Sequence, residues 1–199
     1  MLAALTKRNI LCFTKRPLVR FQHSLITEDD LIHRVDLRVG KITQIEQHQD
    51  ASHLFVEQVD LNTESTEKMP NPRTIVSGLA PFMTKESLLN KDVIVVSNLK
   101  PSKFRGVLSQ GMLLAAGIND AVQVLSPSNG GITGERIQLE GIEYIGNTDP
   151  VLKPKQKVFE QVVSHLKTDE NGFATYKGIK LVTSAGNYVS CELKNAPIS

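Results

Sequence analysis

A series of short apolar runs separated by turn-forming residues limits the fold of this chain more than any other feature of its sequence. The runs occupy residues 54–61, 73–79, 92–99, 107–117, 122–127 and 136–142. Breaks rich in Pro, Gly, Ser and Asn lie between them, such as PNP at 70–72 and SPSNGG at 126–131. Many strand-length segments at this spacing are typical of an all-β barrel or sandwich. We therefore predict a mainly β fold.

Two further segments narrow the prediction to one kind of barrel. In residues 35–42, apolar residues alternate up to Val39, and Gly40 then shifts the phase to Ile42. This pattern predicts a strand with a bulge at Gly40, which is a usual way to bend a barrel strand. The segment MTKESLLNK at 83–91 predicts one short helix between two strands. A small Greek-key barrel with one inserted helix is an OB-fold.

The character of the sequence changes near residue 148. Pro154 precedes an apolar repeat of Val158, Val162 and Leu166, and Asn171 and Gly172 come after it. A helix is predicted here, because Pro is tolerated in a first helical turn and Gly favours helix ends. Strand patterns then return up to residue 193. About 50 residues are too few to bury a good core alone, so we expect this α+β extension to pack on the barrel.

We expect three parts in the chain: a targeting segment or disordered basic tail at 1–26, an OB-fold domain at 27–148 and a C-terminal extension at 149–199. Thr27 precedes three acidic residues and is predicted to cap a short helix. The first 23 residues hold five basic residues and no acidic one, and their apolar and basic side chains separate on a helical wheel. Such a segment is typical of a mitochondrial import signal, which predicts a matrix location. The alternative is a disordered basic tail that contacts RNA in a cytoplasmic protein.

Several classes of protein are not expected from the sequence. Cys12 and Cys191 are the only cysteines, so a disulfide framework or a structural zinc site is not predicted. No apolar run approaches the roughly 20 residues needed to cross a bilayer, so no membrane association is expected. G-x-S-x-G and P-loop motifs are missing. We therefore expect no enzyme activity and no cofactor.

His48 and His53, with Asp50 between them, form the one arrangement in the sequence that suggests a metal ligand set. The competing interpretation is that these residues cap or pack at the start of a strand, and we favour it. No metal site is therefore predicted.

Charge is distributed unevenly along the chain. Residues 24–70 contain four basic and ten acidic residues, whereas residues 90–106 contain four basic residues and one acidic residue. Residues 151–199 hold seven lysines against four acidic residues. Salt screens charges beyond about 10 Å, so the local clusters matter more than the total charge. Any anion-binding surface should therefore be local.

The segment NLKPSKFRGVLSQGMLLAAG at 98–117 brings cations and polar residues together. Lys100 and Lys103 are spaced so that both should reach one face of an irregular loop, where they can contact phosphates, and Arg105 can bind a phosphate or stack on a base. Ser109 and Gln110 could bond bases or ribose hydroxyls. In this RNA-binding interpretation, Phe104 could serve as a stacking platform for a base. The alternative is a charged hairpin in which Phe104 and Met112 belong to the hydrophobic core.

The same segment closely resembles the signature of the tRNA-binding domain shared by bacterial tRNA-binding proteins, methionyl-tRNA synthetase extensions and eukaryotic synthetase cofactors. Further matches are VDLRVGKI at 35–42, HQDASHLFVEQVDL at 48–61 and RTIVSGL at 73–79. The continuation at 151–179 resembles the extra module of the endothelial monocyte-activating polypeptide II-like branch. The similarity begins near residue 33 and runs almost to the end of the chain.

The resemblance implies an OB-fold that binds tRNA by shape and backbone, and that lends affinity to an aminoacyl-tRNA synthetase. It also implies a monomer whose C-terminal module imitates the second subunit of a dimer. The family motif maps onto a set of candidate RNA-binding residues: Asn98, Lys100, Lys103, Arg105, Ser109, Gln110 and Met112. Among these, Asn98 would either orient the loop or contact the RNA. Met112 would either pack in the hydrophobic core or contact the RNA. Phe104 replaces an expected Met, and the connection at 62–72 is longer and more acidic than usual.

Two functional classes are consistent with these observations. The first is a non-catalytic tRNA-binding protein that assists a synthetase or tRNA handling, in mitochondria. The second is a protein-interaction or cytokine-like signalling module without physiological RNA binding. The dependence of tRNA binding on salt distinguishes them, because phosphate contacts release counterions.

Overall fold

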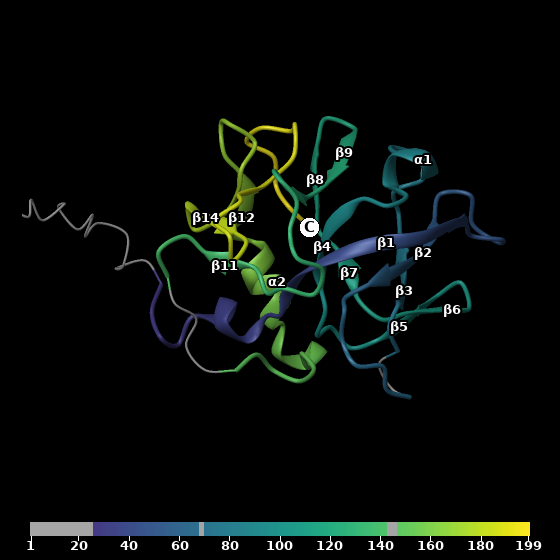
Figure 1. The fold of residues 1–199 in the computed structure, drawn as a ribbon, viewed down its shortest axis with the longest axis horizontal. Helices are drawn as coiled ribbons and strands as arrows, with labels where there is room; N and C mark the ends of the chain where they lie inside the picture. Colours follow the sequence, from purple (N-terminus) through teal and green to yellow (C-terminus); the bar gives the residue numbers. More distant parts are fainter. Residues whose placement is uncertain (1–25, 68–69, 143–146) are drawn as a thin grey trace, which may run out of the picture.

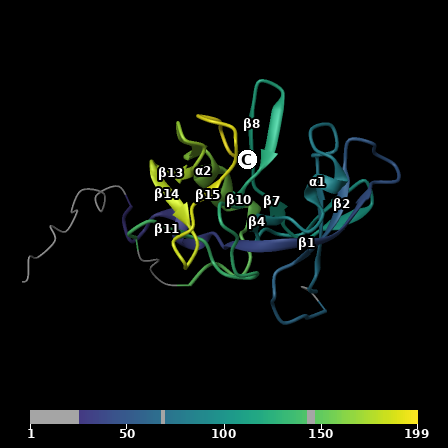
Figure 2. The same ribbon diagram turned by 45° about the horizontal axis from the view of Figure 1, so that its top comes forward.

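The computed structural model describes residues 26–67, 70–142 and 147–199. The predicted targeting segment lies outside the described residues, except for Ile26. The molecule is mainly β and has a barrel beside a smaller α+β part (Figures 1 and 2). Among the described residues, none of the helices is long and apolar enough to cross a membrane.

The barrel region contains these elements: 3-10 helix η1 (Leu31–Arg34), β1 (Leu37–Gln47), β2 (Phe55–Asp60), β3 (Arg73–Ser77), α1 (Lys85–Leu88), β4 (Asp92–Val96), β5 (Ser102–Phe104), β6 (Val107–Ser109), β7 (Met112–Leu113), β8 (Ala115–Ile118), β9 (Ala121–Val124), β10 (Ser126–Pro127) and β11 (Gln138–Leu139). The later elements are 3-10 helix η2 (Pro154–Gln156), α2 (Val158–Val163), β12 (Leu166–Thr168), β13 (Ala174–Tyr176), β14 (Ile179–Val182) and β15 (Val189–Ser190).

Five antiparallel strands form the barrel, in the order β3-β2-β1-β4-β7. The Gln110 amide donates to the Thr74 carbonyl oxygen at 2.8 Å, which joins the end of β6 to β3 and nearly closes the sheet. Helix α1 lies between β3 and β4 in the chain, as the sequence predicts. The Thr84 hydroxyl caps it by accepting from the Ser87 amide. This arrangement confirms the OB-fold.

The predicted bulge at Gly40 is wrong. Gly40 pairs regularly with Val93, and the register of β1 shifts between Ile42 and Gln44 instead. The change of phase has another cause: Val39 faces one hydrophobic core, whereas Ile42 faces a second core on the other side of the strand. A Cβ at Gly40 would lie 2.7 Å from Val59 Cγ1, so the glycine permits close packing.

Strand β4 separates the two hydrophobic cores. Val93 and Val95 face the barrel interior, while Ile94 and Val96 face the core shared with the C-terminal part. All four side chains are buried. The extension is therefore packed on the barrel, as expected from its size.

Three local predictions differ from the structure. The first helix is capped by the Asp30 carboxylate and not by Thr27, since Asp30 Oδ1 accepts from the Ile32 amide at 3.1 Å. Residues 107–117 form three short strands where one was predicted. Helix α2 ends at Val163, and Leu166 begins β12, where it pairs with Tyr176. Leu166 is buried in either case, so its spacing could not distinguish helix from strand.

Candidate nucleic-acid interface

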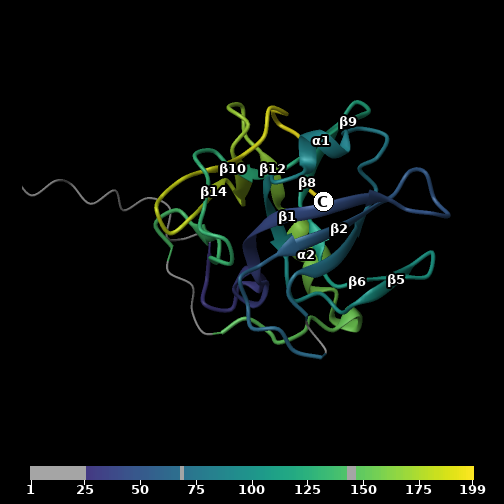
Figure 3. The same cartoon turned by 45° about the vertical axis from the view of Figure 1, so that its right-hand side comes forward.

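A two-stranded hairpin built from β5 and β6 projects from the barrel (Figures 1 and 3). Its turn residues Arg105 and Gly106 both have positive φ, at 48° and 92°. This backbone matches the twist of the flanking strands in a two-residue hairpin. The turn is therefore a tight one, and it fixes the direction of both strands.

The two faces of the hairpin carry different side chains. Lys103 pairs with Leu108, so these two side chains share one face. Ser102 and Phe104 flank Lys103 in β5 and point to the opposite face, because side chains alternate along a strand. The basic and the aromatic side chains of β5 are thus presented to different sides.

The three predicted cations lie on or beside this hairpin, and all three are exposed. Lys100 precedes β5 and lines a groove at the base of the hairpin. Lys103 lies on the outer face, and Arg105 lies at the tip. The structure therefore brings the cations onto one projecting element, but it does not place them on one face.

The tip of the hairpin rests against the turn between β1 and β2. His48 is buried, its Nδ1 accepts from the Asp50 amide at 3.1 Å, and its Nε2 lies 3.3 Å from the Phe104 carbonyl oxygen. Both ring nitrogens are thus used within the protein, in keeping with the packing interpretation. Glu46 and Asp50 line the same depression as Arg105, which makes the tip less positive than its own sequence indicates.

Asn98 lies inside the protein, between the end of β4 and the start of β5. Its Oδ1 accepts from the Asp36 amide at 3.0 Å, and its Nδ2 donates to the carbonyl oxygens of Arg34 and Asp149 at 2.9 and 2.8 Å. The side chain therefore joins the end of β4 to the segment that leads into the extension. Of the two roles considered for Asn98, the structure supports orientation of the loop.

Ser109 and Gln110 also lie inside, where they help to close the barrel. Ser109 Oγ accepts from the Val76 amide at 3.0 Å and donates to the Gly111 carbonyl oxygen at 3.1 Å. Gln110 Oε1 accepts from the Thr74 amide at 3.3 Å. These oxygens complete the hydrogen bonding of β3 where no regular strand partner continues. Both side chains are buried, so they present little surface to an RNA.

A buried cation lies beneath this closure. Arg73 is only 7% exposed, and its Nη1 donates to the Ser97 carbonyl oxygen. Burial lowers the pKa of the Arg73 guanidinium, although Asp36 opposes the shift. Arg73 therefore supports the floor of the site and offers little surface to a ligand.

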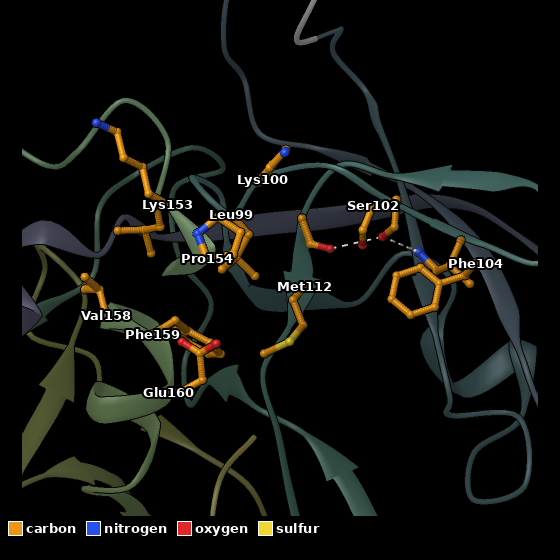
Figure 4. Close-up of a pocket in the computed structure, with 14 residues that line it drawn as sticks. Leu99, Lys100, Ser102, Phe104, Met112, Lys153, Pro154, Val158, Phe159 and Glu160 are labelled. Atoms are coloured by element: carbon orange, nitrogen blue, oxygen red, sulfur yellow. Dashed lines mark hydrogen bonds between the residues drawn. The ribbon is translucent and has the colours of Figure 1, made fainter. Parts of the chain in front are cut away.

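A groove of about 320 Å³ separates the hairpin from η2 and α2. Its lining is mainly apolar and includes Phe104, Met112 and Phe159. Figure 4 shows Phe104 on one side and Phe159 with Glu160 on the other, with the Met112 side chain between them. Met112 is thus both packed against the core and present in the groove wall.

Lys153 extends the basic surface across the groove. A parallel bridge pairs Leu99 with Leu152, and the Leu152 amide donates to the Asn98 carbonyl oxygen at 2.7 Å. Lys100 and Lys153, which directly follow the bridged residues, therefore line the same groove. The sequence LKPKQK at 152–157 is basic, but it is short enough to be an ordinary solvated face. A pairing between residues 53 positions apart leaves no signal in a single sequence, so Lys153 was missed.

Comparison with known proteins agrees with the fold and with the motif. The family model "Putative tRNA binding domain" matches residues 37–136. The chain is 42% identical over 168 residues to cytoplasmic tyrosine–tRNA ligase of Xenopus tropicalis, covering 83% of this chain and 30% of the ligase. It is 41% identical over 145 residues to aminoacyl tRNA synthase complex-interacting multifunctional protein 1 of Mus musculus, covering 73% of this chain and 44% of that protein.

The solved structure of the C-terminal domain of Plasmodium vivax p43 superposes with a TM-score of 0.78 at 32% identity. The match covers 85% of this chain and 99% of that domain, and so includes the extension. The chain spans less than half of the length of the ligase and of the multifunctional protein. On the match of the family model and of the p43 domain, the chain belongs to the tRNA-binding domain family.

Proposed function

We propose that this chain is a non-catalytic tRNA-binding protein that assists an aminoacyl-tRNA synthetase or tRNA handling. The observation that carries the proposal is the projecting β5–β6 hairpin, with Lys100, Lys103 and Arg105 on or beside it and Lys153 across the groove. Cations on a projecting element can follow the phosphates of a folded RNA without reading its bases. The names of the relatives, which are a tRNA ligase and a synthetase-complex protein, support the same partners.

We propose that the protein is a monomer, and the packing of the extension on the barrel supports this oligomeric state. The extension packs on the barrel through a large shared core, with Ile94, Val96 and Tyr176 among its members. In a pseudo-dimer, that contact takes the place of a second subunit. Sedimentation of the free chain tests this point: a dimer would contradict it.

Filter binding of the full chain to total tRNA across a salt series tests the function. We expect affinity to fall steeply with salt, and Lys103→Ala with Arg105→Ala to reduce the slope of log K against log salt by about one to two. Lys167→Ala with Lys194→Ala is the charge-matched control, since both lysines are exposed in the extension. β12, which carries Lys167, lies far from the hairpin (Figures 1 and 3). Equal losses in both double variants would contradict the proposed surface.

A protein-interaction module is the second candidate. Phe82 and Leu89, which flank α1, are 45% and 43% exposed, and exposed apolar side chains suit protein contacts better than RNA. Under this alternative, tRNA binding would be undetectable or insensitive to salt.

We also propose that the protein acts in the mitochondrial matrix. The support is the acid-free basic composition of the first 23 residues. A fluorescent protein carrying residues 1–26 should enter mitochondria, whereas the same fusion with Lys7, Arg8 and Lys15 changed to Glu should stay outside. Import of both fusions, or of neither, would contradict the proposal.

A further inference from the structure

We propose that the groove between the β5–β6 hairpin and α2 binds one unpaired guanine base of the tRNA. This inference rests on the proposed function and adds a base-specific subsite to a surface that otherwise contacts phosphates. The residues that carry it are Phe104, Met112 and Glu160 inside the groove, with Lys100 and Lys153 at its rim.

The shape and lining of the groove suit a flat aromatic ligand. Its volume of about 320 Å³ has room for one base. Phe104 is 44% exposed and turns toward the groove. Exposure of an aromatic ring to water does not stabilise the folded protein, so the ring is available to a ligand. Unpaired bases in RNA are bound by stacking on such side chains. Met112 offers a polarizable apolar surface between Phe104 and Phe159 (Figure 4).

Charge at the rim favours a nucleotide over an apolar peptide segment. Lys100 and Lys153 are exposed and directly follow the bridged residues Leu99 and Leu152, so they lie beside each other at the rim of the groove. A base inserted between the hairpin and α2 brings its own phosphates to the rim, where two ammonium groups can neutralise them. An apolar peptide would leave these charges without partners.

Glu160 gives the groove a means of choosing among bases. Its carboxylate lies beside Phe159 and faces the groove (Figure 4). A carboxylate only accepts hydrogen bonds, and it does so best from two adjacent donors. The Watson–Crick edge of guanine presents N1–H and the N2 amino group side by side. On the other three bases each donor has an acceptor beside it, which a carboxylate repels.

Kethoxal footprinting of total tRNA, with and without the full chain, tests this inference, because kethoxal reacts with N1 and N2 of unpaired guanines. We expect the chain to protect an unpaired guanine, and Glu160→Gln to restore its reactivity. Glu170→Gln, at an exposed glutamate in the turn between β12 and β13, is the matched control and should keep the protection. Protection that survives Glu160→Gln, or no protected guanine on bound tRNA, would overturn the proposal.

Labelled trinucleotides separate this inference from the proposed function. We expect UGU to bind about tenfold more tightly than UAU, UCU or UUU, and Glu160→Gln to remove this preference. Phe104→Ala should weaken all four, and because Phe104 is exposed the variant should still fold. Equal binding of the four trinucleotides by a protein that binds tRNA with a steep salt slope would overturn the guanine site and leave the proposed function standing. If the wild-type chain did not bind tRNA at all, the proposed function itself would be overturned.

Discussion

The Asn98 side-chain amide donates a hydrogen bond to the Asp149 carbonyl oxygen at 2.8 Å, and so joins the barrel to the segment that leads into the extension. The two residues are 51 positions apart in the chain. Two further hydrogen bonds of Asn98, to Asp36 and Arg34, fix the same junction. The junction in turn sets the spacing between the two walls of the groove.

Replacement of Asn98 by Ala should therefore lower the free energy of unfolding. The variant removes the partners of the Asp36 amide and of the Asp149 carbonyl oxygen, whereas the Arg34 carbonyl oxygen still accepts from the Asp149 amide, and we expect a loss of about 3 kcal/mol. Urea unfolding measures it as a lower midpoint at unchanged m-value. Asn147→Ala, at an exposed position, is the control and should change stability by less than about 0.5 kcal/mol. Equal stability of the two variants would show that the junction contributes little.

Gly40→Ala should destabilise the barrel through overpacking. The new methyl group would lie 2.7 Å from Val59 Cγ1 and 2.9 Å from Val95 Cγ2, and these branched side chains have little freedom to move. We expect a cost of about 1–3 kcal/mol in thermal or urea unfolding. Gly78→Ala is the matched control, since no atom of the described residues other than its two chain neighbours lies within 4 Å of the added carbon there. A harmless Gly40→Ala would mean that the barrel relaxes more easily than its packing suggests.

The stability of the protein should fall as pH rises from about 4.5 to about 7 because of Glu57. Burial raises the pKa of this carboxyl to about 7, although a hydrogen bond from Ser77 opposes the shift. The unfolded chain releases the proton near pH 4.5, whereas the folded protein keeps it to about pH 7. The stabilising contribution is therefore complete below pH 4.5 and is lost between these values.

Glu57→Gln, which stays neutral at every pH, isolates this effect. We expect the difference in unfolding free energy between wild type and variant to shift by about 3 kcal/mol in favour of the variant between pH 4.5 and 8. Urea unfolding of both proteins across that range measures it. A difference that does not change with pH would contradict the assignment to Glu57.

His48→Ala should loosen the tip of the hairpin without unfolding the barrel. The variant loses the contact with the Phe104 carbonyl oxygen and the acceptor of the Asp50 amide. We expect amide protons of β5 and β6 to exchange about fivefold faster, which corresponds to about 1 kcal/mol of local stability. Hydrogen exchange followed by NMR measures this change. His53→Ala, at the exposed neighbouring histidine, is the control and should leave the exchange rates unaltered. Faster exchange in both variants would show that His48 does not specifically stabilise the hairpin.

The class of fold could be predicted because the strands of a small barrel leave local signals in the sequence. Apolar runs and turn residues located most strands, and Thr84 with the residues after it located α1. The position of the β1 bulge was missed because an alternation of apolar residues does not say which core each one enters. Val39 and Ile42 face different cores, and this fact comes only from the packing of the extension.

The sequence predicted the exposure of the cations in the motif, but it did not predict the burial of the motif's polar residues. Lys103 and Arg105 are exposed on the hairpin, as a basic loop should be. A polar residue in a binding motif can equally serve the backbone, and for Ser109 and Asn98 only the fold shows the hydrogen-bond partners. Lys153 reaches the site through pairing with a distant strand end, which no local pattern records.

The two-sided burial of β4 has a consequence for how such a protein can evolve. Because Ile94 and Val96 on one face belong to the core that the extension shares, removal of the extension would expose an apolar stripe along β4. A descendant could lose that part only if polar side chains replaced this stripe or another chain covered it. Loss of the extension and a change in the exposed face of β4 would thus have to occur together.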